Sequence, residues 1–198
     1  MRIVCISDTH GMHRRLRIPP GDVLVHAGDI TMKGGKNEML DFDKWIKELP
    51  HKHKVVICGN HDLCFEDTPE LARSWLTNAH YLQDDSIIIE GLKFYGSPWQ
   101  PTFHNWAFNL ERGETIKKVW DKIPNDTDVL ITHGPPHGIL DLNYEREKCG
   151  CEELLLAVNR VRPKIHIFGH IHEAYGEVKL NGTHFINPCS CDLSYVPR

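Results

Sequence analysis

Short apolar runs alternate with longer amphipathic stretches along this chain, a pattern typical of strands that alternate with helices. The apolar runs predict strands at residues 2–7, 22–26, 54–58, 128–132 and 164–168. The amphipathic stretches predict helices at residues 36–49, 69–76, 112–122 and 151–161. This order of elements favours an α/β fold.

The first two predicted helices have clear boundaries. Apolar side chains recur at helical spacing from Met39 to Leu49, and Pro50 follows directly. Proline ends a helix because it lacks the backbone N–H and its ring clashes with the preceding turn. Pro69 opens the second helix, where a proline in the first turn is well tolerated.

Two hairpins interrupt the alternation of strands and helices. Residues 86–90 and 92–95 flank Gly91, and residues 177–180 and 184–186 flank Asn181-Gly182, a pair that suits a tight turn. Hairpins at two places in a βαβ background predict two packed mixed β-sheets flanked by helices. No repeat or linker divides the chain, so we expect a single domain over residues 1–198.

The net charge of −4 narrows the classes of partner. General nucleic-acid and anionic-membrane binders need a basic face, so neither partner is expected. No apolar run reaches the roughly 20 residues of a membrane-spanning helix. The segment Met1–Ser7 is too short for a signal sequence and leads straight into polar residues, so we interpret it as a strand. We therefore expect a cytoplasmic protein.

Seven cysteines raise the question of a zinc site. One residue separates Cys149 from Cys151 and one separates Cys189 from Cys191, whereas structural zinc usually has two to four residues between paired cysteines. We expect reduced thiols that pack as small apolar side chains.

Polar clusters directly follow each of the five predicted strands. They are Asp8-Thr9-His10, Gly28-Asp29, Gly59-Asn60-His61-Asp62, Thr132-His133-Gly134 and Gly169-His170-Ile171-His172. Ligands of α/β sheets bind beyond the carboxyl ends of the strands, so these clusters can converge. Any one of these clusters would be an ordinary loop sequence, but five of them, each at the end of a strand, indicate a single shared site.

The residue types in these clusters fit a pair of metal ions. Imidazoles, carboxylates and one amide oxygen suit manganese, iron, zinc or cobalt better than a thiolate-selected metal. Two divalent cations about 3.5–4 Å apart can clamp a phosphate and lower the pKa of a bound water. We expect two divalent ions, with manganese as the activator in vitro.

The order of these clusters resembles that of the calcineurin-like metallophosphoesterase superfamily over nearly the whole chain. Further stretches are similar to the small metallophosphoesterase-domain proteins of the brain 239 type. They are Ser7–Gly11, Val25–Asp29, His133–Pro136, Phe168–His172 and Asn187–Asp192. The resemblance implies a four-layer α/β/β/α sandwich.

The resemblance also implies a role for each residue of the clusters. Asp8, His10 and His172 would hold the first metal, and Asn60, His133 and His170 the second. Asp29 would bridge the two ions. His61 would contact the phosphate and protonate the leaving oxygen, oriented by Asp62 or Asp29. Both His170 and His172 are present, which favours an active enzyme.

The expected reaction is hydrolysis of a small phosphodiester, such as a cyclic nucleotide. Asn60 and His61 are candidate substrate contacts, and His13 and His137 join them because they closely follow metal motifs. Two alternatives stay open. One is a non-catalytic or weakly active nucleotide-binding protein, and the other is a nuclease, for which only Arg14, Arg15 and Arg17 would offer a basic cluster. A protein phosphatase ranks third, because the recognition elements of that branch of the superfamily are not evident.

The aromatic loop Ser97–Trp106 has two interpretations. It could cap the site and stack on a nucleobase, or pack its rings on the domain surface.

Overall fold

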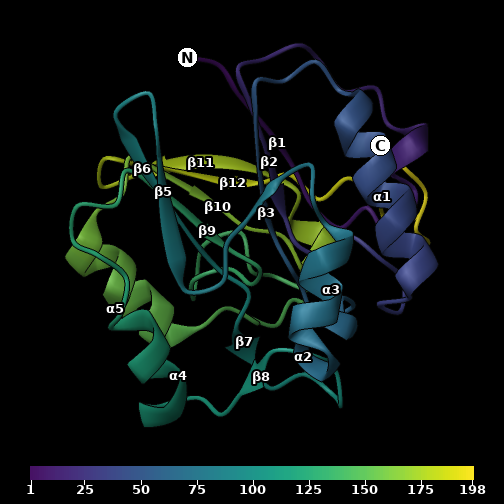
Figure 1. The fold of residues 1–198 in the computed structure, drawn as a ribbon. Coiled ribbons are helices and arrows are strands. Elements are labelled where there is room, and N and C mark those ends of the chain that lie inside the picture. Colours follow the sequence, from purple (N-terminus) through teal and green to yellow (C-terminus); the bar gives the residue numbers. More distant parts are fainter.

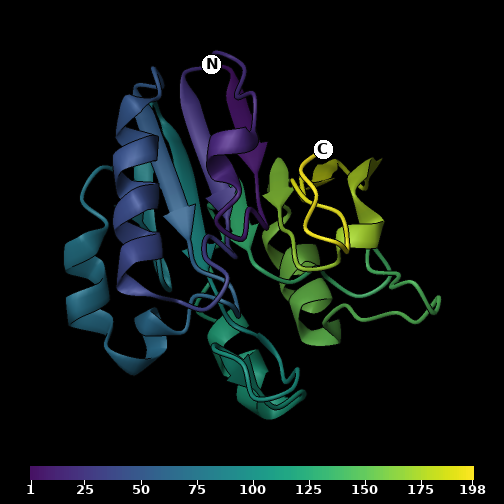
Figure 2. The same cartoon turned by 90° about the vertical axis from the view of Figure 1, so that its right-hand side faces the viewer.

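Two β-sheets lie face to face with helices on both outer faces in the computed structural model, which describes all residues 1–198 (Figures 1 and 2). The first sheet has the order β1 (Ile3–Ile6), β2 (Val23–Ala27), β3 (His53–Ile57) and β4 (His80–Tyr81). The second has the order β11 (Gly176–Leu180), β12 (Thr183–Asn187), β10 (Ile165–Ile167), β9 (Val129–Thr132), β6 (Leu92–Ser97) and β5 (Asp85–Ile89). β7 (Gln100–Pro101) and β8 (Asn109–Leu110) form a separate pair.

The helices divide between the two sheets. One side carries α1 (Lys36–Glu48), α2 (Cys64–Asp67) and α3 (Pro69–Trp75), and the other carries α4 (Glu114–Trp120) and α5 (Glu152–Val161) (Figure 1). Two 3₁₀ helices lie next to site motifs: η1 (His13–Arg15) follows the first motif, and η2 (His172–Ala174) begins at the last residue of the fifth. No helix is both long and apolar enough to cross a membrane.

Three separate hydrophobic cores account for the layers. The middle core joins the two sheets, and Val25, Phe94 and Ile131 are fully buried in it. Phe42 of α1 lies in the core on one outer face, and Trp120 of α4 lies in the core on the other. Three cores between four layers confirm the predicted α/β class and the α/β/β/α sandwich.

The first sheet differs from the expectation of two mixed sheets, because all of its strand pairs are parallel. Each connection between its strands is a crossover, by way of η1, then α1, then α2 and α3. The second sheet is mixed: β5 with β6 and β11 with β12 are antiparallel, and its other pairs are parallel.

The predicted hairpins and helices are present with small shifts at their ends. Asn181 and Gly182 both have positive φ, 50° and 87°, as expected for the turn between β11 and β12. The helix predicted at residues 112–122 is shorter, Glu114–Trp120. The short helix α2 and the strands β4, β7 and β8 were not predicted, since two to four residues are too few to show a period.

Candidate metal centre

The first group of predicted ligands meets where β1 and β10 end. The Nε2 atoms of His10 and His172 lie 3.2 Å apart, and His172 Nε2 lies 3.5 Å from Asp8 Oδ1. Asp8 and His10 follow the first sheet, and His172 follows the second. The packing of the two sheets therefore brings together residues that are 162 positions apart.

The second group meets where β3, β9 and β10 end. His133 Nε2 lies 2.9 Å from Asn60 Oδ1, and the rings of His133 and His170 are 5.1 Å apart. Ligand atoms of Asp29, His133 and His170 all lie within 4.8 Å of one another. This group also takes residues from both sheets.

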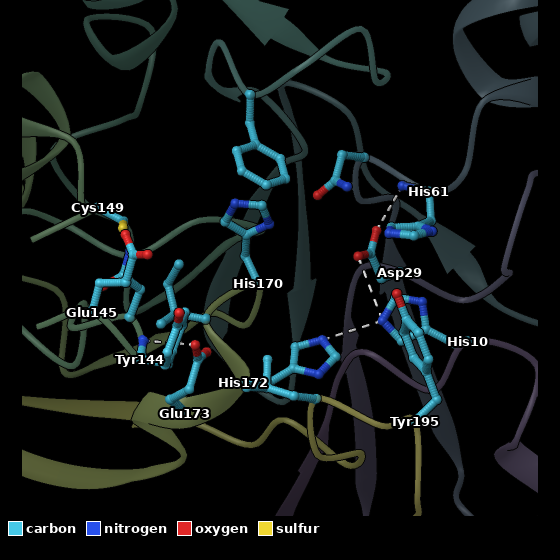
Figure 3. A pocket seen from close by; sticks show the side chains of 15 residues that line it. His10, Asp29, His61, Tyr144, Glu145, Cys149, His170, His172, Glu173 and Tyr195 are labelled. Atoms are coloured by element: carbon cyan, nitrogen blue, oxygen red, sulfur yellow. Dashed lines mark hydrogen bonds and ion pairs between the residues drawn. The ribbon is translucent and has the colours of Figure 1, made fainter. Parts of the chain in front are cut away.

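Asp29 lies between the two groups. One of its carboxylate oxygens is 3.8 Å from His10 Nε2, and the other is 3.4 Å from His133 Nε2. Its side chain is almost fully buried. Asp29 is thus placed as a bridging carboxylate would be, within reach of both groups (Figure 3).

Strained backbone positions cluster at this site. Asp8, His10, Asp29 and His170 all have positive φ, between 44° and 69°. Side chains other than glycine rarely adopt this conformation, which persists where the surrounding structure enforces it. At Gly169 a Cβ would collide with Asp8 and Ser7, so this glycine lets the backbone approach the Asp8 carboxylate closely. Such strain is typical of functional sites.

Two imidazoles are oriented by backbone carbonyls. The Nδ1–H of His133 donates to Ala27 O at 3.0 Å, and the Nδ1–H of His172 donates to Asp192 O at 3.0 Å. Each Nε2 atom therefore faces the site. Backbone acceptors of this kind fix the tautomer of metal-binding histidines.

The charges of the site favour a cation. Burial lowers the pKa of His133, but the carboxylates of Asp29 and Asp8 outweigh burial and raise it to about 9. Burial also opposes protonation of His172, and its hydrogen bond with Asp8 outweighs this and raises its pKa to about 9. A buried site that stabilises positive charge on its imidazoles, with mixed nitrogen and oxygen donors, fits two divalent metal ions.

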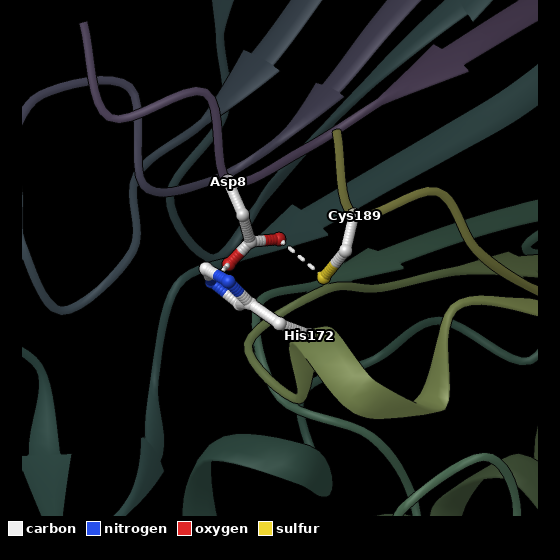
Figure 4. A group of neighbouring side chains, drawn as sticks. All are labelled: Asp8, His172 and Cys189. Carbon is white, nitrogen blue, oxygen red and sulfur yellow. Dashed lines mark hydrogen bonds and ion pairs between the residues drawn. The ribbon is translucent and has the colours of Figure 1, made fainter. Parts of the chain in front are cut away.

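Cys189 contacts the first group, whereas the sequence predicted only a packed thiol at this position. Its Sγ–H donates to Asp8 Oδ2 at 3.0 Å, and the side chain is fully buried (Figure 4). Burial, with the nearby charge of Asp8, raises the pKa of the Cys189 thiol well above its usual value. The thiol is therefore a hydrogen-bond donor that holds Asp8.

His61 lies beside the ligand groups. Its Nδ1–H donates to Met32 O at 2.8 Å, and its backbone N–H donates to Asp29 Oδ1 at 2.8 Å. The His61 ring is 4.6 Å from that of His10 and stacks on Trp106 at 4.2 Å with an interplanar angle of 29°. Its side chain is the one predicted to donate a proton.

Asp62 has a different position from the one expected. Its carboxylate accepts the backbone N–H groups of Ile30, Thr31 and Gly59 and the Thr31 hydroxyl. It therefore ties the loop after β2 to the loop after β3. The imidazole of His61 is oriented by Met32 O and Trp106. Asp29 accepts a hydrogen bond only from the His61 backbone, although a ring nitrogen of His61 lies within 4.8 Å of its carboxylate.

Comparisons with known proteins agree with this geometry. Residues 1–174 match the calcineurin-like phosphoesterase family. The chain is 42% identical to human metallophosphoesterase domain-containing protein 1, over 99% of this chain and 68% of that protein. It is 44% identical to a UPF0046 protein of Caenorhabditis elegans, over 97% of this chain and 76% of that protein.

The chain belongs to the calcineurin-like metallophosphoesterase family.

A solved crystal structure shows the same fold, with a TM-score of 0.70 and 16% identity over 94% of this chain and 90% of that one.

The metallophosphoesterase centre opens into a cavity of about 430 Å³. Its floor is formed by ligand residues, and its far wall by residues 143–145, Cys149 and Glu173 (Figure 3). Asn60 and His61 line it, as expected for substrate contacts. The volume is within the range of small-molecule sites.

His13 and His137 do not line this cavity. η1 turns the chain back after His10, so His13 is buried against α1, where it bonds Asp41 at 3.0 Å and packs on Trp45. His137 lies 3.5 Å from Glu152 at the start of α5. Both residues therefore pack against helices beside the site, and their positions do not support contact with a substrate.

The aromatic loop Ser97–Trp106 combines both of its expected roles. Trp99 donates to Asp84 and packs on Phe108, away from the cavity. Phe103 lines the cavity and meets the ring of His170 edge-on at 5.4 Å, while Trp106 stacks on His61. One end of the loop packs on the domain and the other covers the site.

Proposed function

We propose that this metallophosphoesterase is a phosphodiesterase that hydrolyses small phosphodiesters, such as cyclic nucleotides. Asp8, His10 and His172 would hold one cation, Asn60, His133 and His170 the other, and Asp29 both. The cations, with manganese the first choice, would neutralise the phosphoryl oxygens and acidify a water.

The observation that carries the proposal is the placement of His61. With its Nδ1–H committed to Met32 O, its Nε2 is the ring atom left for a substrate, and the residue lines the same cavity as Asp29 and Asn60. A proton on Nε2 can pass to the departing oxygen of an ester bound there. An alkoxide leaves poorly without such a proton, which favours diesters of sugar hydroxyls.

The cavity also favours a small substrate over a polymer. None of its fifteen lining residues is lysine or arginine, so no basic track leads a nucleic-acid backbone to the centre. Arg14 pairs with Asp41 and Glu48, which engages one of the basic residues near the first motif. The nuclease alternative therefore has little support.

The test compares two substrates after reconstitution with manganese. Bis-p-nitrophenyl phosphate has a good leaving group, whereas a cyclic nucleotide must expel an alkoxide. We expect Asp29→Ala to abolish both activities, and His61→Ala to reduce cyclic-nucleotide turnover ~10²–10⁴-fold with a smaller effect on the nitrophenyl ester. His80→Ala, at an exposed histidine of β4, is the matched control.

Two results would contradict the proposal. Binding of two metals without turnover of any diester would favour the nucleotide-binding alternative. Faster hydrolysis of p-nitrophenyl phosphate than of the diester would instead indicate a phosphomonoesterase.

A further inference from the structure

The far wall of the cavity has a charge opposite to that of the metal centre. Glu145 and Glu173 line it, and none of the lining residues is lysine or arginine. The metal pair could neutralise one phosphate, but a second phosphate in this cavity would face carboxylates. The charge of this wall favours a substrate with one phosphate and an uncharged remainder that donates hydrogen bonds.

This wall is a built structure. Glu173 directly follows the ligand His172, and its Oε1 accepts the backbone N–H of Tyr144 at 2.8 Å (Figure 3). Asn143 and Glu147 bond each other twice across the turn, at 3.0 and 2.9 Å. These bonds hold the segment 143–147 beside the metal centre.

Glu145 is the unused acceptor of this wall. Its carboxylate makes no hydrogen bond or ion pair with the rest of the chain. Arg112 and Lys148 line the adjoining hollow, and neither forms a hydrogen bond or ion pair with Glu145. Arg112 donates to Glu152 and to two backbone carbonyls, so it is already engaged. A ligand in the cavity would therefore meet Glu145 as a free carboxylate.

Aromatic rings lie around the rim of the same cavity. Tyr144 is 73% exposed, Phe103 46% and Tyr195 36%, so these rings are available to a ligand. Exposed rings that flank a carboxylate suit a flat heterocycle, which can stack while its edge donates N–H groups. A cationic group would also suit a carboxylate and aromatic rings, but two divalent cations close by would repel it.

We propose that this wall is a nucleobase subsite that selects guanine through Glu145. Guanine donates two adjacent N–H groups from one edge, which match the two oxygens of a carboxylate. Uracil presents carbonyl oxygens on either side of its single N–H, and these would be repelled. This inference rests on the proposed diesterase function, since it names the substrate class of that site.

The experiment measures kcat/KM for cyclic GMP and cyclic UMP in the manganese-loaded enzyme, for the native chain and for Glu145→Gln. We expect the native enzyme to prefer cyclic GMP, and the variant to lose roughly tenfold or more on cyclic GMP with little change on cyclic UMP. Glu70→Gln, an exposed position on α3, makes the same charge change away from the cavity. It should leave both values unchanged.

Turnover of bis-p-nitrophenyl phosphate separates the two proposals. This ester has no nucleobase, so its metal-dependent hydrolysis by the native chain tests the diesterase function alone. Equal kcat/KM values for both cyclic nucleotides, or an equal loss on both in the variant, would overturn the guanine subsite while leaving the diesterase intact. Faster, Glu145-dependent cleavage of a choline phosphodiester would overturn it in favour of a cation subsite.

Discussion

The two sides of the cavity are built in opposite ways. The metal side consists mostly of buried residues at strand ends. Four of its seven ligand residues have strained backbone conformations, and further buried groups such as Cys189 and Asp62 support it. The far side consists of exposed residues on the irregular segment 143–147, held mainly by hydrogen bonds with Glu173 and within its own turn.

This difference separates chemistry from selectivity. Ligand residues that are buried and strained tolerate few changes, because each is fixed by several neighbours. Exposed loop residues can change with little cost in stability, so the choice of substrate can vary while the reaction stays the same. Variants on the metal side should therefore lose turnover or metal binding, whereas variants on the far side should change only the preference among substrates. Four measurements test this difference.

We expect the largest loss of activity when a methyl group is added to a glycine on the metal side. Gly169→Ala would push a Cβ into Asp8 and Ser7 and displace a ligand, so we expect at least about a hundredfold loss of metal-dependent turnover and weaker metal binding. Gly134→Ala also lies beside a ligand, but its Cβ would meet only Gln100 Cβ, at 3.8 Å. Similar losses in both variants would mean that close packing at Gly169 is not the cause.

A smaller effect is expected where the aromatic loop meets the metal side. Trp106→Ala removes the ring stacked on His61, so we expect about a tenfold loss on a cyclic nucleotide and almost none on bis-p-nitrophenyl phosphate. Trp106→Phe should restore most of the lost rate. A loss that is the same for both leaving groups would assign Trp106 a general structural role.

Metal removal should affect stability through the metal side alone. Manganese at a hundred times its Kd would stabilise the native state by about 2.7 kcal/mol, which for a chain of this size corresponds to a rise in Tm of roughly 5–10 °C. Asp29→Ala should lose most of this rise, and Glu145→Gln should keep it. Thermal melts with and without a chelator provide the measurement, and an equal rise in all three proteins would contradict a centre organised around Asp29.

Acid should destabilise the layers behind the metal side. Burial lowers the pKa of His26 and of His166 to about 3, so each stays neutral in the fold while the unfolded chain takes up a proton below about pH 6.5. Stability should therefore fall between about pH 6.5 and 3. In metal-free protein, His166→Asn should reduce this slope by up to about 1.4 kcal/mol per pH unit. The control variant His80→Asn should leave the pH slope of stability unchanged. Denaturant titrations at several pH values measure this slope. The same slope in both variants as in the native chain would mean that His166 is not responsible.

Local patterns in the sequence predict most of the fold and most of the metal side. The strands around Val25 and Ile131 are short, apolar and buried, so their burial requires no knowledge of distant partners. Ligand clusters follow these strands immediately, and parallel strands bring them to one edge. Seven predicted ligands, from Asp8 to His172, therefore lie together in the structure.

What the sequence did not predict depends on contacts between distant segments. Cys189 bonds Asp8 across 181 positions, and Met32 O orients His61 through a backbone atom that no side-chain pattern reveals. His13 shows the opposite error, because proximity in sequence to His10 suggested a shared site that η1 prevents. The segment 143–147 has neither a period nor a motif, so its place in the cavity emerges only in three dimensions.

The division of the ligands between two sheets has a consequence for how the molecule assembles. Each ligand group needs residues from both sheets. The first group is complete only when Asp8 and His10 meet His172, and the second only when Asn60 meets His133 and His170. A folding intermediate with only one sheet formed would hold an incomplete chelate and bind ions weakly. Uptake of the metal pair would then coincide with docking of the two sheets. Binding of a spectroscopically visible ion such as cobalt would therefore report the rate of that step.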